Sequence, residues 1–133
     1  MIQEFRAWNK ATKEKHEADD IVSLNFEEKQ ICVKTLFFGQ LNYYDFDDIV
    51  LMQSTGLKDK NGKEIFEGDI VQYQNTKVPS ADSKGVIRYF DNWAMFGIDI
   101  EHNEPRALFF NGLADHISLE VVGNIYENPE LIE

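Results

Sequence analysis

Residues 85–100 read GVIRYFDNWAMFGIDI, and this stretch carries the strongest fold signal of the chain. Mostly apolar stretches with the alternation of a strand lie on both sides of the step Asp91-Asn92. Asp and Asn both tolerate left-handed backbone. The stretch therefore predicts two antiparallel strands, 85–90 and 93–100, joined by a tight two-residue turn. Residues paired across a hairpin share a face. One predicted face is apolar and carries Ile87, Tyr89, Phe96, Ile98 and Ile100.

The opposite face of this hairpin mixes aromatic, sulfur-containing and cationic side chains. It carries Val86, Arg88, Phe90, Trp93 and Met95. Aromatic residues, Arg and Met are enriched at protein interfaces, which makes Arg88, Phe90, Trp93 and Met95 the interaction candidates of this chain. Two other interpretations remain open. The face can pack against another part of the same chain, or it can stack nucleobases beside a cation.

Outward from the hairpin, short apolar or alternating stretches bounded by turn residues predict further strands. These strands are 5–8, 22–26, 31–38, 70–74 and 119–126, with 22–26 and 31–38 forming a second hairpin. The apolar block 49–53 is too short to classify by periodicity, so a buried strand and a helical turn both fit, and we favour the strand. The chain is thus predicted to be predominantly β.

Two turns are marked by their residue types. The stretch 58–63, KDKNGK, contains an Asn61-Gly62 step that suits two residues at positive φ, and it is interpreted as a connector between two halves of the chain. Near the C-terminus, Asn128 is a good helix N-cap before a proline at the first helical position, so one helical turn is expected there.

Composition limits the classes of function. The 133-residue chain carries a formal charge of −11, so its mean field repels phosphate backbones. Cys32 is the only cysteine, which excludes an intrachain disulfide and fits a reducing cytoplasm. The N-terminus lacks the pattern of a signal peptide, and no apolar run approaches the ~20 residues that span a bilayer. We therefore expect a cytoplasmic protein without membrane contact.

The sequence contains no recognisable catalytic, metal or cofactor site. The three histidines, His16, His102 and His116, are far apart and have no ligand partner at zinc-site spacing. Neither a nucleophile elbow nor a glycine-rich phosphate loop occurs, and Cys32 falls within a predicted strand, where an inert buried thiol is expected. We expect no catalytic residues, no metal and no cofactor, and hence not an enzyme.

Three blocks of sequence resemble one protein family. Residues 51–71, LMQSTGLKDKNGKEIFEGDIV, resemble the central motif of YopX-like proteins, which phages and prophages of Gram-positive bacteria encode. The start FRAWN at 5–9 and the end VGNIYENPEL at 122–131 resemble the termini of that family. The resemblance implies an α+β fold that is predominantly β, with an N-terminal β-rich (α+β) lobe, 1–56, and a C-terminal Src-homology-3-like β-barrel, 57–133. It implies no established activity and offers no catalytic residue.

Together these observations predict a phage or prophage accessory protein of the bacterial cytoplasm that acts by binding. The expected partners are a second copy of the chain, giving a homo-oligomer that uses the Arg88, Phe90, Trp93 and Met95 face, and a host or phage protein. A nucleic-acid-binding barrel using that face is an alternative. A further alternative is an acidic mimic of DNA that occupies a host protein.

Overall fold

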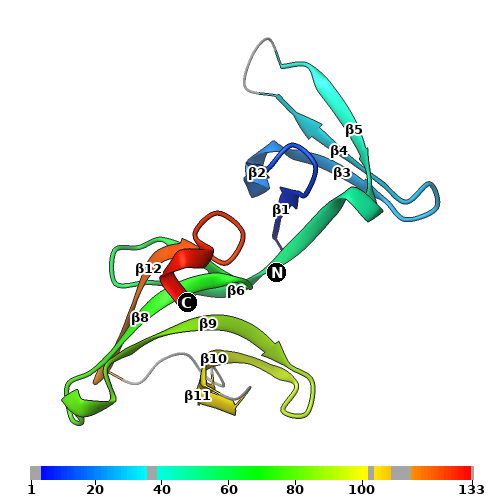
Figure 1. Ribbon diagram of the computed structural model, residues 1–133. Helices are drawn as coiled ribbons and strands as arrows, with labels where there is room; N and C mark the ends of the chain where they lie inside the picture. The colour runs from blue at the N-terminus through cyan, green and yellow to red at the C-terminus, as the bar shows by residue number, and fades with distance from the viewer. Residues whose placement is uncertain (1–3, 36–38, 102–103, 109–114, 133) are drawn as a thin grey trace. The chain divides into compact units, whose positions relative to one another are not determined.

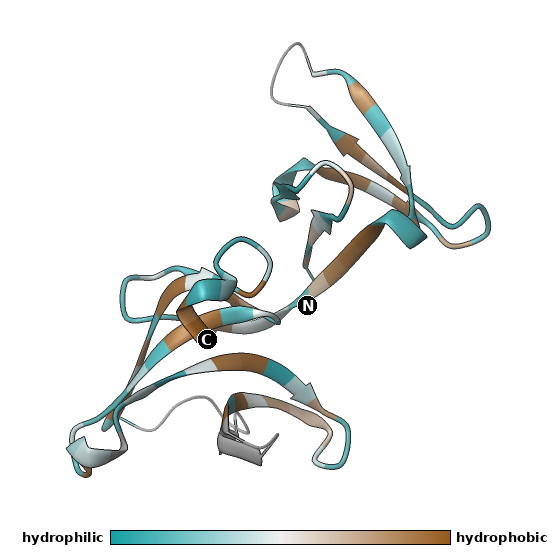
Figure 2. Ribbon diagram, in the orientation of Figure 1, coloured by the Kyte–Doolittle hydropathy of each residue, from teal (hydrophilic) through white to brown (hydrophobic). Residues whose placement is uncertain are grey.

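The computed structural model describes residues 4–35, 39–101, 104–108 and 115–132 (Figure 1). The chain divides into two compact units, Met1–Gln53 and Ser54–Glu133, which are built from antiparallel strands and short 3₁₀ turns. The prediction of a predominantly β protein is confirmed. Figure 2 shows that hydrophobic residues concentrate on the strands, whereas the turns are mostly hydrophilic.

The first unit contains two small sheets. Its elements are β1 (Phe5–Asn9), β2 (Glu14–His16), η1 (Ala18–Asp20), β3 (Ile21–Asn25), β4 (Gln30–Lys34), β5 (Leu41–Asp45), η2 (Phe46–Asp48) and the first half of β6 (Ile49–Lys58). β1 lies between β2 and β6, and β4 lies between β3 and β5. The predicted hairpin of β3 and β4 is confirmed, but its second strand ends at Lys34. Residues 36–38 of the predicted strand lie outside the described ranges.

The core of the first unit forms from the alternating apolar positions of these strands. Its buried members are Ala7, Ile31, Val33 and Ile49, against which Ile21, Leu24, Tyr44, Phe46 and Leu51 pack. The apolar block 49–53 is a strand, as we favoured, and it pairs antiparallel with the whole of β1. Each fully buried aliphatic side chain of this kind contributes about 1.5–3 kcal/mol relative to exposure.

The second unit is a five-stranded antiparallel sheet that curls into a half-barrel (Figure 1). Its strand order is β11-β10-β9-β8-β12, and β7 pairs with the second half of β6 beside it. The elements are β7 (Glu64–Phe66), β8 (Asp69–Asn75), η3 (Pro79–Ala81), β9 (Ser83–Phe90), β10 (Met95–Glu101), β11 (Glu104–Leu108), β12 (Ile117–Asn124) and η4 (Pro129–Ile132). The helical turn predicted after Asn128 is therefore present as η4.

One face of this sheet lines the core of the second unit, which contains Ile65, Val71, Tyr73, Ile87, Ile98 and Leu119. Gly85 lies on the same face, opposite Val71. A Cβ atom at Gly85 would overlap Cγ2 of Ile98, so only glycine leaves room for the isoleucine side chain.

The turn between β6 and β7 is fastened to β12 by Asp59. Its Oδ1 accepts hydrogen bonds from the backbone N–H groups of Asn61 and Lys63, each at 2.9 Å, and its Oδ2 accepts one from Val121 at 2.9 Å. Only Gly62, at φ 82°, has positive φ in this turn, so the prediction of two left-handed residues is wrong. The Asp59 carboxylate replaces the primed turn because it binds the N–H groups of a wider five-residue loop.

Candidate functional site

The tip of the β9–β10 hairpin is the part of the chain where the sequence placed the interaction candidates. Met95 pairs with Phe90, so the turn contains four residues, 91–94, and the predicted two-residue turn is wrong. The Trp93 N–H donates to the Phe90 carbonyl at 3.0 Å, as in a type I turn, and Ala94 at φ 52° closes the loop in left-handed backbone.

The predicted faces are nevertheless confirmed for the paired residues. Tyr89 pairs with Phe96 and Ile87 with Ile98, while Phe90 and Met95 share the opposite face with Arg88. Enlarging the turn by two residues shifts the register by two, and side chains alternate with a period of two, so no paired residue changes face.

The interaction candidates differ in how far they reach solvent. Trp93 lies in the turn and is 56% exposed, whereas Phe90 and Met95 are half-buried. Val86, which shares their face, is only 5% exposed. The Arg88 guanidinium Nε lies 2.9 Å from Oδ2 of Asp99, a carboxylate that is itself only 11% exposed. The open part of this face is therefore its tip, around Trp93.

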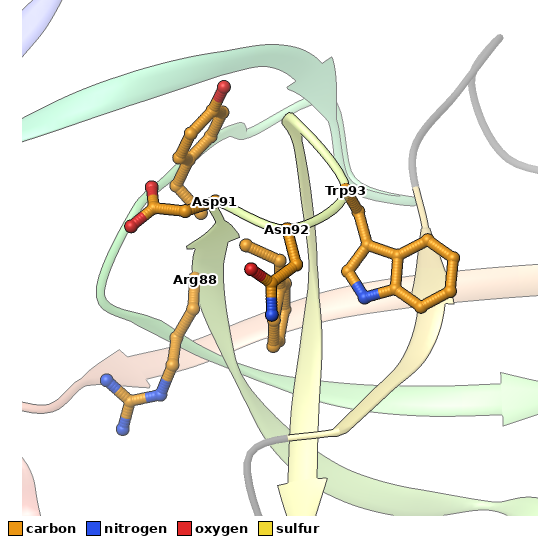
Figure 3. A pocket seen from close by; sticks show the side chains of 6 residues that line it. Arg88, Asp91, Asn92 and Trp93 are labelled. Atoms are coloured by element: carbon orange, nitrogen blue, oxygen red, sulfur yellow. The ribbon is translucent and has the colours of Figure 1, made fainter.

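A pocket of about 290 Å³ lies at this tip (Figure 3). Its lining consists of Arg88, Tyr89, Phe90, Asp91, Asn92 and Trp93. In Figure 3, Asn92 lies between the indole of Trp93 and the side chains of Arg88 and Asp91. The volume is at the lower limit of ligand pockets, roughly 300–1,000 Å³, and so suits a protein side chain better than a cofactor.

The charges of the pocket are unequally compensated. Arg88 is neutralised by Asp99, on the neighbouring strand and the same face. Within the part of the chain that the structure describes, no ion-pair or hydrogen-bond partner faces the Asp91 carboxylate. Among its described residues, the pocket thus combines aromatic walls with a negative charge that has no ion-pair partner. Aromatic faces attract cations, so this combination favours a cationic side chain as its occupant.

Sequence reasoning missed three members of the pocket: Tyr89, Asp91 and Asn92. The sequence pattern predicts Asp91 and Asn92 only as turn-forming residues and places Tyr89 on the apolar face. Tyr89 is on that face, with its ring 5.2 Å from the Phe96 ring, but it is exposed because it lies at the end of the strand. An acidic residue between two exposed aromatic residues, Tyr89 and Trp93, at the tip of a hairpin is the signal that could have identified the site.

The described residues offer little other chemistry. Among residues 4–35, 39–101, 104–108 and 115–132, no group of three His, Cys, Asp or Glu side chains is arranged to hold a metal. His102 lies outside these ranges. Cys32 is buried in β4, as expected. No helix within the described ranges is long and apolar enough to cross a membrane.

The chain matches the family model described as YopX protein over residues 4–133. Among solved structures, it is similar to protein EF1440 from Enterococcus faecalis, with 33% sequence identity, a TM-score of 0.63 and coverage of 100% of this chain and 99% of that chain. It is also similar to protein yopX from Bacillus subtilis, with 23% identity, a TM-score of 0.65 and coverage of 98% of each chain. No curated protein matches the sequence.

Proposed function

Because the chain belongs to the YopX family, as its motifs indicated, we propose that it is a phage or prophage accessory protein that acts by binding, not by catalysis. It works in the cytoplasm of the bacterial host. Its partner is another protein, which presents a Lys or Arg side chain to the pocket at the tip of the β9–β10 hairpin.

One observation carries this proposal: an exposed Trp93 lines the same pocket as the Asp91 carboxylate, which has no ion-pair partner among the described residues. A cation placed over an indole gains about 0.5–2 kcal/mol, and more of that range as water is excluded. Asp91 adds an opposite charge at the same place. The formal charge of −11 over the whole chain attracts a basic partner at longer range.

The same charges argue against the nucleic-acid-binding alternative. Among the described residues that line the pocket, the only cation is Arg88, and it already forms an ion pair with Asp99 at 2.9 Å. A phosphate near Trp93 would also meet the carboxylate of Asp91. Aromatic stacking alone would have to offset both repulsions, whereas proteins that bind single strands combine stacking with a positively charged groove.

The proposal also treats the second unit as a Src-homology-3-like barrel. Its five curled antiparallel strands support this assignment. So does the β6–β7 turn, since the N–H of Lys60 donates to the Leu119 carbonyl at 2.9 Å and Asp59 accepts from Val121, which covers the outer edge of β12. Small barrels commonly place their binding residues in loops at one end, and the hairpin tip would be such a site.

Site-specific photocrosslinking tests the proposal. A photoreactive phenylalanine analogue replaces Asn92, inside the pocket, or Lys77, an exposed residue of the same unit that does not line it. We expect a crosslink to a host or phage protein from position 92 and not from position 77, with a Lys- or Arg-rich segment at the crosslinked site. Asp91→Asn should reduce its yield.

Several outcomes would contradict the proposal. These are equal crosslinking from both positions, capture of nucleic acid from position 92, or an acidic segment at the crosslinked site. Identification of the captured protein also decides between a general basic partner and the DNA-mimic alternative, because the latter requires a protein that normally binds nucleic acid.

A further inference from the structure

The three-stranded sheet of the first unit ends at β5 on one side (Figure 1). β5 pairs with β4 through five consecutive residue pairs without a register shift. Over the ranges that the structure describes, no strand pairs with the other edge of β5. This edge belongs to neither the hairpin pocket nor the proposed function.

Hydrogen bonds at both ends of the β4–β5 ladder fix which residues face the free edge. The Thr35 N–H donates to the Gln40 carbonyl at 2.8 Å, and the Phe46 N–H donates to the Lys29 carbonyl at 2.9 Å. Bonded pairs alternate in an antiparallel ladder, so Asn42 and Tyr44 direct their backbone groups toward β4. The N–H and C=O groups of Leu41, Tyr43 and Asp45 therefore point away from β4, toward the free edge.

The same three residues also carry their side chains on the face opposite the core. Tyr43 is 63% exposed and Leu41 is 45% exposed, while Asn42 and Tyr44 are half-buried. Tyr43 is paired with Cys32 of β4, and the interaction with that thiol raises the pKa of Tyr43 above its ordinary value.

β5 has few of the features with which proteins usually block an edge strand. It contains no Lys, Arg or Pro, and its one charged residue, Asp45, is the last of the strand. Its ladder has no bulge. The opposite edge of the same sheet, β3, does have an irregularity between Ile21 and Ser23, of the kind that disfavours edge-to-edge pairing. The two edges of one sheet thus differ, and β5 is the one suited to accept another strand.

We propose that β5 pairs antiparallel with β5 of a second copy of this chain, about a two-fold axis at Tyr43. This register uses all three outward-facing residues. Tyr43 pairs with Tyr43 of the second copy, and Leu41 pairs with Asp45 in both directions. Any other antiparallel register would leave at least one outward-facing residue unpaired. A two-fold interface of this type is closed, so the assembly stops at a dimer.

Charge complementarity supports a second copy as the occupant. Within one subunit, Lys34 stands beside Leu41 and Gln30 beside Asp45 on the same face. In the proposed register the row across the interface would read Lys34, Leu41, then Asp45 of the second copy. The flexible lysine side chain can cross over Leu41 toward that carboxylate. The two-fold symmetry forms this contact between Lys34 and Asp45 twice, and the proposed register places no like charges directly opposite each other across the interface.

The contact is small. It involves five residues from each subunit, whereas standard interfaces use roughly 20–30 residues a side. The dimer should therefore be weak and depend on concentration, with dissociation in the micromolar range or above.

Sedimentation equilibrium across the micromolar range tests the proposal with Tyr43→Pro. Proline is compatible with an edge strand, and at position 43 it removes an N–H that makes no bond to β4. We expect the wild type to dimerise, and Tyr43→Pro to stay monomeric with an unchanged circular dichroism spectrum. Trp93→Ala, at the hairpin tip of the other unit, serves as the control and should dimerise like the wild type.

A second pair of variants covers the case in which Tyr43→Pro does not fold. Leu41→Lys places a cation opposite Asp45 of the second copy, whereas Leu41→Asp places an anion there. Position 41 faces Asp45 of the second copy twice in the dimer, and both pairs are attractive in Leu41→Lys but repulsive in Leu41→Asp. Leu41→Lys should therefore dimerise about tenfold more tightly than Leu41→Asp.

The proposal is overturned by a wild type that stays monomeric at high micromolar concentration, or by equal dimerisation of the two Leu41 variants. A folded Tyr43→Pro that dimerises like the wild type would also overturn it. Loss of the dimer in Trp93→Ala alone would move the interface to the hairpin.

Discussion

Replacement of Asp59 by Asn tests how the second unit holds its β6–β7 turn against β12. The carboxylate is 8% exposed and accepts three backbone hydrogen bonds. In Asp59→Asn the shape is conserved and Oδ1 can still accept from Asn61 and Lys63. The new NH₂ group, however, faces the N–H of Val121, so two donors meet and that bond is lost.

The magnitude follows from the type of bond removed. A hydrogen bond to a charged group contributes about 1.5–3 kcal/mol, and the loss of charge also weakens the two bonds that remain. We expect Asp59→Asn to lower the free energy of unfolding by about 2–4 kcal/mol, which corresponds to a melting temperature lower by on the order of 10 °C. Equilibrium urea unfolding followed by circular dichroism measures the difference.

The stabilisation that the Asp59 carboxylate provides should decrease as the pH falls. Burial alone raises the pKa of Asp59, but hydrogen bonds from the N–H groups of Val121, Lys63 and Asn61, together with the Lys63 charge, outweigh it and hold the pKa below its ordinary value of 3.8. The folded protein then binds this proton less tightly than the unfolded chain does. The stabilisation is complete above the unfolded pKa and is lost as the pH falls through the folded pKa.

The difference between wild type and Asp59→Asn should therefore be constant near neutral pH and shrink below about pH 4. Asp91→Asn, at an exposed carboxylate of the same unit, is the matched control and should change stability by less than about 0.5 kcal/mol. A destabilisation by Asp59→Asn that is as small as in the control, or one that persists unchanged at acid pH, would refute this reasoning.

Further substitutions test individual backbone and packing features. Ala94→Gly should raise the free energy of unfolding by about 1 kcal/mol, because Ala94 adopts φ 52°, a left-handed conformation that strains alanine but not glycine. Equal or lower stability of the variant in urea would show that Ala94 is not strained. Gly85→Ala should cost about 1–3 kcal/mol through the contact with Ile98, again measured in urea, and a neutral result would mean that Ile98 can move. His16→Phe should raise the melting temperature, since the buried Nε2 of His16 has no hydrogen-bond partner in the described chain; a lower value would indicate a missed partner. Trp93→Ala should leave the melting temperature within about 2 °C of the wild type, because the side chain is exposed; unfolding would show that it belongs to the core.

The faces of the β9–β10 hairpin could be predicted because they depend only on alternation. The length of its turn could not. A type I turn closed by a left-handed residue needs no glycine, and Ala94 gives no signal in the sequence that it adopts φ 52°. As a result Trp93 was placed on a strand, although it lies in the loop, where it is more exposed than a strand position would allow.

The role of Asp59 could not be derived from local sequence for a different reason. The Asn61-Gly62 step is a good signal for a primed turn, but one partner of Asp59 is Val121, 62 residues away. A contact over such a separation exists only in the folded chain. Arg88 and Asp99 are only 11 residues apart and share one face of the hairpin, but their ion pair depends on the register that the four-residue turn sets. This pair neutralises the positive charge that made a nucleic-acid contact conceivable.

The edge strand β5 was missed altogether. The apolar run from Ile31 predicts a strand as far as residue 38, but the strand ends at Lys34 and Gly39 adopts φ 61° before β5 begins. Alternation in β5, with sequence LNYYD, places tyrosines on both faces and so hides which face is buried. Only the register with β4 distinguishes exposed Tyr43 from half-buried Tyr44.

The most direct test of cation binding at the hairpin tip uses the two tryptophans as probe and internal control. Trp93 is 56% exposed in the pocket, whereas Trp8 is 9% exposed in the first unit, so their indole N–H groups give separate signals in a ¹⁵N-resolved NMR spectrum. Titration with a short Arg- and Lys-rich peptide should shift the Trp93 signal progressively, leave Trp8 in place, and have a smaller effect in Asp91→Asn. An acidic peptide of equal length and a single-stranded oligonucleotide should shift neither signal. A Trp93 signal that ignores the basic peptide, or that responds as strongly to the oligonucleotide, would contradict the account.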